Sequence, residues 1–555
     1  MAGTSEQPPK QPPKQPMNVL WIMADQLRWD YLSCYGHPSL KTPNIDRLAE
    51  RGVRFDRAYV QSPICGPSRM SFYTGRYVRS HGSTWNGFPL RVGEPTLGDH
   101  LRRLGVRPVL VGKTHMVPDT AGMEWLGIDP GSPIGTTIAQ CGFEPYERDD
   151  GLHPDGPYDP DPPYDAYLRG QGLDGANPWE AWANSAEGDD GELLSGWLLA
   201  NSDRPARVPD EHSETPYLTR RCIDFIDQAE KQSSAGPWLC HLSYIKPHWP
   251  YIVPAPYHDM YGPGDIKPAV RGNAERASDH PVYRAFQDHR VCRAFARDEV
   301  RERVIPAYMG LIKQIDDQLG ILFAHLEAKG LMERTMIVFS SDHGDYLGDH
   351  WLGEKDLFHE PSVRIPFIVA DPRPSADATR GTASDALVEG IDLAPTILDY
   401  YGGDTLPHVV EGRSLAPLLA GERDAPWRRY AISEYDYATR KTRMALGIDQ
   451  ADARLIMVCD ARWKLVHAEG FRPMLFDLES DPDELDDLGA DPDHEAERTR
   501  LLEAIFTWAR RHHTRITLMP DEIEAMSGRE PPGILIGFWD EAEARAAGVW
   551  PVAPE

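Results

Sequence analysis

A cysteine and an arginine stand four positions apart, as Cys65 and Arg69, in the run CGPSR. In a helix this spacing places both residues on one face, so the guanidinium of Arg69 would reach back toward residue 65. A cysteine-based phosphatase requires the spacing C-x5-R, but the residue six positions after Cys65 is Ser71. The run therefore excludes that arrangement and, taken alone, fits either a reactive side chain or a buried free thiol ahead of a helix.

Two pairs of polar residues directly follow apolar runs. Asp25 and Gln26 come after VLWIM, and Asp342 and His343 come after TMIVFSS. A single Asp in such a place is usually a cap. However, carboxylates and imidazoles are also ligands for divalent metals, and the carboxyl ends of parallel strands share one edge of a sheet. The two pairs together predict a metal site at that edge.

Basic side chains recur in three further segments. Lys113 and His115 lie in VGKTH, His248 lies in KPHWP, and Lys355 lies in GEKDL. Each alone is more often a surface or structural residue. The spacing of Lys113 and His115 would place both on the same side of an extended segment. Because the carboxyl ends of parallel strands share one edge of a sheet, these polar segments could lie in one cleft with the two pairs above.

The elements that must position these residues alternate short apolar runs with amphipathic stretches. For example, Thr42 can cap a helix that has Pro43 in its first turn and stops at Gly52, just before the strand candidate VRFDRAYV. Such alternation predicts an α/β fold with a large, mainly parallel sheet between helices. After about Arg428, shorter alternating segments predict a smaller antiparallel sheet domain.

We therefore divide the chain into four parts. Residues 1–16 are a Pro-, Gln- and Lys-rich stretch, expected to be a flexible prefix and neither a signal peptide nor a structural element. Residues 17–427 form the catalytic α/β domain, and residues 428–519 form the small α+β domain. Residues 520–555 carry Trp and Phe in a mobile-looking setting, which indicates an arm that contacts a partner subunit in a homodimer or homotetramer.

The composition restricts the partners and the compartment. With 58 basic and 86 acidic residues among 555, the formal charge of -28 would repel nucleic acid and anionic membranes. No apolar stretch is long enough to span a bilayer. The seven cysteines are odd in number and scattered without any CxxC pair, which indicates reduced thiols and a cytoplasmic protein.

In the order of these motifs, the chain resembles the sulfatases of the alkaline phosphatase superfamily. Their C-x-P-x-R signature directs oxidation of the cysteine to formylglycine by the formylglycine-generating enzyme, and CGPSR matches it. A later pair of segments, WKLVHA and MLFDLESDPDEL, is similar to the C-terminal part of the family. The resemblance extends from about Asn18 to Leu488 and implies an alkaline-phosphatase-like fold with formylglycine at position 65.

The resemblance also implies one divalent metal ion held by Asp25, Gln26, Asp342, His343 and residue 65. Sulfatases usually offer Asp-Asp and Asp-Asn at the two pairs, whereas Gln26 and His343 are variants associated with phosphonate monoester hydrolases. An imidazole is less suited to Ca²⁺, which prefers oxygen ligands, than to Mn²⁺. We therefore favour Mn²⁺, with Ca²⁺ as the alternative.

The remaining residues take their implied roles from the same family. Lys113 and Lys355 would hold the sulfate, and Arg69 would reach the formylglycine oxygens. His115 would deprotonate the hemiacetal, and His248 would protonate or stabilise the leaving oxygen. Phosphonate monoester hydrolases carry Tyr and Thr where this chain has Lys113 and His115, so the chain resembles the sulfatases at these two positions.

The aldehyde explains why the cysteine must be oxidised. Its hydrate has two hydroxyls on one carbon, so one can attack sulfur and a base acting on the other can expel sulfate. The resemblance thus implies an arylsulfatase-type sulfuric ester hydrolase acting on small anionic esters, with overlapping activity on phosphonate monoesters and phosphodiesters. Two alternatives stay open: a phosphonate monoester hydrolase or phosphodiesterase, and a non-catalytic binding protein whose Cys65 is never oxidised.

Overall fold

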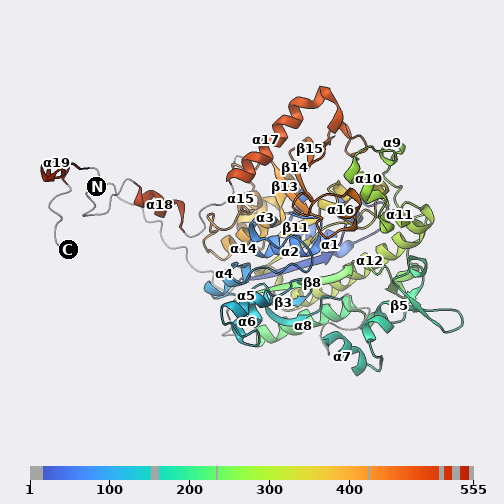
Figure 1. Cartoon of the computed structure of the whole chain (residues 1–555). Coiled ribbons are helices and arrows are strands. Elements are labelled where there is room, and N and C mark those ends of the chain that lie inside the picture. Colours follow the sequence, from blue (N-terminus) through green and yellow to red (C-terminus); the bar gives the residue numbers. More distant parts are fainter. Residues whose placement is uncertain are drawn as a thin grey trace.

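An eight-stranded sheet lies at the centre of the chain (Figure 1). The computed structural model describes residues 17–151, 162–232, 236–422, 425–511, 518–527 and 538–548. The predicted prefix lies outside these residues, as does part of the predicted C-terminal arm. Within the described residues, no helix is both long enough and apolar enough to cross a membrane.

The strands of this sheet run in the order β12-β2-β11-β10-β1-β8-β3-β4. All neighbours are parallel except β11, which is antiparallel to both β10 and β2. The strands are β1 (Asn18–Asp25), β2 (Val53–Tyr59), β3 (Arg107–Gly112), β4 (Glu144–Arg148), β8 (Trp238–Pro247), β10 (Thr335–Ser341), β11 (Phe367–Ala370) and β12 (Thr382–Glu389).

Helices cover both faces of the sheet, and strand β1 shows why. Its side chains alternate between two apolar cores: Trp21 belongs to one and Ile22 to the other. One core contains residues of α2 (Cys65–Thr74), α4 (Leu97–Arg103) and α14 (Leu393–Tyr400). The other contains residues of α1 (Pro43–Arg51), α8 (Glu214–Lys231) and α12 (Asp298–Ala328). Because every central strand is covered on both sides, its sequence is almost continuously apolar.

A second, four-stranded antiparallel sheet follows in the order β13-β14-β15-β16. One of its faces shares the core that contains α2, and the other packs against α17 (Glu495–Arg511). The predicted combination of a large, mainly parallel sheet and a smaller antiparallel one is confirmed. The strands are β13 (Ala431–Asp436), β14 (Arg454–Cys459), β15 (Trp463–Ala468) and β16 (Met474–Asp477).

A buried ammonium group joins the small sheet to the large unit. Lys464 on β15 is fully buried, and its Nζ lies 2.7 Å from both Glu360 Oε1 and Glu484 Oε1. The same Nζ donates to the Phe358 carbonyl oxygen at 3.0 Å. Phe358 and Glu360 belong to the segment that follows Lys355. The small sheet therefore supports a loop that carries one of the predicted site residues.

We predict that Lys464→Ala lowers the free energy of unfolding by about 3–5 kcal/mol, because it removes the lysine that pairs with the buried Glu484 and leaves Glu360 with Arg364 alone. Urea unfolding of the two proteins measures the difference. Arg462→Ala is the matched control: this neighbouring arginine bonds Asp477 at 2.7 Å but is half exposed, so its loss should cost little. Equal losses from the two substitutions would contradict the role given to Lys464.

Candidate active site and metal centre

Four adjacent parallel strands deliver predicted site residues to one edge of the large sheet. β1 ends at Asp25, β8 ends one residue before His248, β3 ends one residue before Lys113, and β10 ends one residue before Asp342. These strands stand side by side in the order β10-β1-β8-β3. Since they are parallel, their carboxyl ends lie at the same edge, where ligands bind in open α/β sheets.

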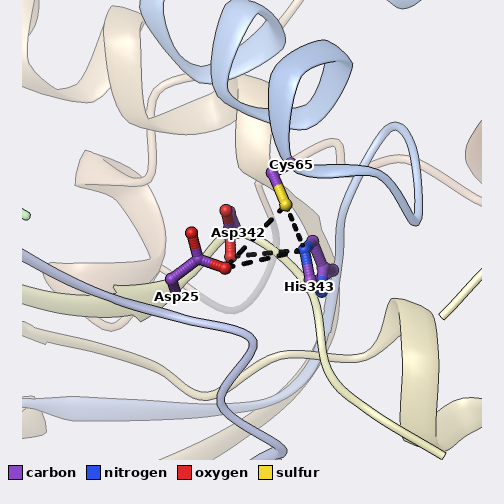
Figure 2. A group of neighbouring side chains, drawn as sticks. All are labelled: Asp25, Cys65, Asp342 and His343. Atoms are coloured by element: carbon purple, nitrogen blue, oxygen red, sulfur yellow. Dashed lines mark hydrogen bonds and ion pairs between the residues drawn. The ribbon is translucent and has the colours of Figure 1, made fainter. Parts of the chain in front are cut away.

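Helix α2 brings Cys65 to the same place. Cys65 is the first residue of the helix, and all ten residues of α2 are buried. Figure 2 shows the side chains of Cys65, Asp25, Asp342 and His343 pointing toward one another. Cys65 Sγ lies 3.0 Å from His343 Nε2 and 3.9 Å from Asp25 Oδ1. Residues separated by almost 280 positions in the sequence thus meet around a single point.

The chemistry of this group fits one divalent metal ion. Its four ligand atoms all lie within 4.8 Å of one another. His343 Nδ1 is 2.8 Å from the Gly344 carbonyl oxygen, which only accepts, so Nδ1 carries the hydrogen and Nε2 keeps a free lone pair. That Nε2 lies 3.8 Å from an oxygen of Asp25 and an oxygen of Asp342. Three electron-pair donors that face each other are stabilised when a cation lies between them.

Arg69 forms hydrogen bonds with the carboxylates of both Asp25 and Asp342. Its Nε donates to Asp342 Oδ2 at 2.7 Å, and its Nη2 donates to Asp25 Oδ2 at 3.2 Å. Its Nη1 donates to Ser243 Oγ at 2.8 Å and to the Lys113 carbonyl oxygen at 2.9 Å. We expected the guanidinium to reach back to residue 65. In the structure its bonds fix the two carboxylates, because these acceptors lie closest to its planar fork.

Lys355 connects three of the other predicted residues. Its Nζ lies 3.0 Å from Gln26 Oε1, 3.2 Å from Cys65 Sγ and 3.2 Å from His248 Nε2. His248 Nδ1 lies 2.8 Å from the Trp249 carbonyl oxygen, so it carries the ring hydrogen and Nε2 accepts from Lys355. The proton of this pair is therefore held on Lys355.

Lys113 and His115 are placed differently from each other. Lys113 is fully buried, and its Nζ is paired with Asp25 Oδ2 at 2.6 Å. His115 is half-buried, its Nδ1 is enclosed, and this atom has no hydrogen-bond partner among the described residues. Its φ is +56°, so the segment is not extended through His115 as the sequence suggested. The reason is that β3 ends at Gly112, and residues 113–117 belong to no helix, strand or turn.

The structure thus connects the predicted residues into one network of contacts. The exception is His115, whose side chain forms no hydrogen bond with the other described residues. The sequence analysis did not include two residues that take part in this network, Asp345 and Tyr251. The amide nitrogen of Gln26 donates to both, and Tyr251 donates to Asp345 at 2.5 Å. These bonds fix which way the Gln26 amide points. An acidic residue two positions after His343, in the run DHGD, was the available sequence signal.

Burial and neighbouring charges shift the pKa values of Asp25, His248 and His343. Burial alone would raise the pKa of Asp25, but the cations beside it, Lys113 foremost, hold that pKa well below its usual range. Burial lowers the pKa of His248, and Lys355 lowers it further. Burial also lowers the pKa of His343. Both imidazoles are consequently neutral near pH 7, which leaves His343 able to ligate a metal.

This arrangement, a mainly parallel sheet with metal-type ligands at the carboxyl ends of its central strands, defines the alkaline-phosphatase-like class. Residues 17–403 match the family model described as Sulfatase, and residues 348–510 match the one described as N-sulphoglucosamine sulphohydrolase, C-terminal. The chain therefore belongs to the sulfatase family, within the alkaline phosphatase superfamily, and is an enzyme of that family.

Three relatives illustrate this. The chain is 32% identical over 521 residues to the multifunctional alkaline phosphatase superfamily protein PehA of Trinickia caryophylli, covering 90% of this chain and 96% of that protein. It is 28% identical over 484 residues to an arylsulfatase of Clostridium perfringens, covering 85% and 90%. The solved structure of the phosphonate monoester hydrolase of Agrobacterium radiobacter is similar with a TM-score of 0.76 and 30% identity, covering 89% and 96%.

We predict that Asp342→Ala abolishes both stoichiometric divalent metal and activity, because the substitution removes a candidate metal ligand and an acceptor of Arg69. Elemental analysis of the purified protein measures the first effect. Asp371→Ala is the matched control: Asp371 also directly follows a strand and bonds an arginine, Arg373, at 2.6 Å, but β11 is antiparallel and ends at the opposite edge. Retention of metal by Asp342→Ala, or its loss from Asp371→Ala, would contradict this assignment.

Proposed function

We propose that this protein hydrolyses sulfate esters in the manner of an arylsulfatase, with Cys65 converted to formylglycine and one divalent metal ion. The observation that carries the proposal is the position of residue 65. It starts a buried helix, and its side chain touches both the ligand-type group of Asp25, Asp342 and His343 and the ammonium of Lys355. A nucleophile at this point is in contact with a metal ligand on one side and with an anion-binding lysine on the other.

The charge of the site supports a monoanionic substrate. Arg69, Lys113 and Lys355 are buried cations, and Asp25 and Asp342 are the carboxylates that face them. A divalent ion would add further positive charge. A sulfate monoester carries one negative charge, so it would be attracted into this pocket although the whole chain is strongly acidic.

The residues that would hold the metal are Asp25, Gln26, Asp342, His343 and residue 65. The ion would supply Lewis-acid polarisation and activation of the hydroxyl of residue 65. Gln26 enters this set through its amide oxygen, which Asp345 and Tyr251 orient by taking the amide hydrogens. The imidazole of His343 favours Mn²⁺ over Ca²⁺.

The other site residues bind the sulfate group and transfer protons. Lys113 and Lys355 hold the sulfate oxygens. The Lys355 and His248 pair stabilises the leaving oxygen, and the proton available for it is on Lys355 because His248 Nε2 accepts. His115, whose Nδ1 has no partner among the described residues, is the base for the second step. Maturation requires the formylglycine-generating enzyme, and we place the protein in the cytoplasm without nucleic acid or membrane partners.

A second candidate is hydrolysis of phosphonate monoesters or phosphodiesters. Gln26 and His343 favour it, as does the likeness to a solved phosphonate monoester hydrolase. We expect overlapping activities with a larger kcat/KM for the sulfate, because Lys113 and His115 are of the sulfatase type. Steady-state comparison of an aryl sulfate with an aryl phenylphosphonate measures the ratio. A ratio that favours the phosphonate would make the second candidate the main function.

We predict that Cys65 is at least partly oxidised to formylglycine when the protein is made in a host that contains the modifying enzyme. Mass analysis of the peptide that contains residue 65 measures the conversion, and it also excludes a binding protein with an unmodified thiol. Cys65→Ser should be inactive in turnover, because a single hydroxyl cannot expel sulfate by the aldehyde route. A fully active protein whose Cys65 is an unmodified thiol would refute the proposal.

We predict opposite kinetics for two histidine variants. In His115→Ala only the second step is lost, so one fast turnover precedes a slow steady state. In His248→Ala the first step is slowed, most strongly for poor leaving groups, so a nitrophenyl ester suffers less than an alkyl ester. Each loss is on the order of 10²- to 10⁴-fold. Rapid-quench measurements decide: a burst in His248→Ala and none in His115→Ala would show that the roles are reversed.

A further inference from the structure

His115 adopts a backbone conformation that a non-glycine residue rarely holds without support. Its φ of +56° lies in the left-handed region, which is unfavourable for an L-residue. Such a conformation persists only where the surroundings fix it. The question is which groups fix it, since the direction of the His115 ring depends on them.

The carboxylate of Asp150 is the group that does so. Its Oδ1 accepts two consecutive backbone N–H groups, those of Thr114 and His115, both at 2.9 Å. Its Oδ2 accepts from Arg148 Nε at 2.7 Å, and Arg148 Nη2 donates to the Met116 carbonyl oxygen at 2.8 Å. Burial alone would raise the pKa of Asp150, but Arg148 and the His115 amide keep that pKa below its ordinary value. The carboxylate is therefore ionised at neutral pH.

The other end of the same segment is fixed by the catalytic core. The Lys113 amide donates to the Ser243 carbonyl oxygen at 3.1 Å, and the Lys113 carbonyl accepts from Arg69 at 2.9 Å. Gly112 directly before it has a φ of +109°, and a Cβ there would lie 2.0 Å from the Ser243 oxygen. Lys113 is thus held by β8 and α2, whereas His115 is held by Asp150 alone among the side chains of the described residues.

We infer that Asp150, oriented by Arg148, is a positioning residue that holds the backbone of Thr114 and His115 so that the His115 ring faces the reacting group. This inference rests on the proposed function, in which His115 acts in the second step. Asp150 touches no substrate atom and acts only through the backbone of the loop. It follows β4, the neighbour of β3, so the edge strand of the sheet orients a residue of the adjacent catalytic loop.

The first experiment removes the acceptor. In Asp150→Ala the two amides lose their partner and the His115 ring is no longer fixed. A displacement of about 1 Å can cost up to about 10²-fold, so the steady-state rate with an aryl sulfate should fall by about that factor while the first turnover stays fast. Hydrogen exchange of the amides of residues 113–116 should become faster. Asp150→Asn keeps an oxygen acceptor and should stay close to the wild-type rate.

Asp316→Ala is the matched control for loss of stability. Asp316 Oδ1 also accepts two consecutive backbone N–H groups, those of Asn44 and Ile45, both at 2.9 Å, but it lies on α12 away from the site. Assayed well below its unfolding temperature, this variant should keep both the steady-state rate and the exchange behaviour of residues 113–116. If Asp150→Ala does not fold, Arg148→Gln, which removes the group that orients Asp150, takes its place.

Several outcomes would overturn the inference. A wild-type steady-state rate in Asp150→Ala, unchanged amide exchange, a slowed first turnover, or an equal loss in Asp316→Ala would each do so. If the wild-type enzyme itself does not hydrolyse aryl sulfates, the proposed function fails. The exchange measurement still decides in that case whether Asp150 holds the loop.

Discussion

The contact between one guanidinium and two carboxylates, all without exposure to solvent, is the constraint on which the site depends. Arg69 bonds Asp25 and Asp342, which end neighbouring strands, and it projects from the helix that begins with Cys65. Two buried carboxylates this close would repel each other and would tend to bind protons without a counter-charge. Arg69 supplies positive charge to both carboxylates and connects α2 to the ends of the two strands. The metal-type ligands and the helix that begins with Cys65 are thereby connected through a single residue.

Two lysine side chains add positive charge around these carboxylates. Lys113 pairs with Asp25, whereas Lys355 contacts Gln26, Cys65 and His248, which are not carboxylates. The loop that carries Lys355 is in turn supported by Lys464 of the small sheet. The C-terminal sheet therefore supports the segment of a candidate site residue without supplying a site residue itself.

Part of the backbone strain in this protein lies next to the candidate site. Among the ten described non-glycine residues with positive φ, Gln26 and His115 are predicted site residues, and Glu354 and Asp356 flank Lys355. Such conformations are costly and are found where hydrogen bonds over-determine them. The Gln26 backbone N–H is bonded to Asp342 and that of His115 to Asp150. Rigid placement reduces the rearrangement needed when a substrate binds.

The sequence by itself determined the class of the fold and predicted most residues of the candidate site. Apolar runs that end in Asp25 and Asp342 predict buried parallel strands, and strands of that kind bring their carboxyl ends to one edge, so both the ligand pairs and their meeting point follow from local pattern and geometry. Side-chain direction did not follow. Arg69 was expected to face residue 65 and instead faces the carboxylates, and the segment with His115 was expected to be extended. Both depend on partners such as Asp150 that are remote in the sequence or lie on another strand, and only the packed chain decides which acceptor is nearest.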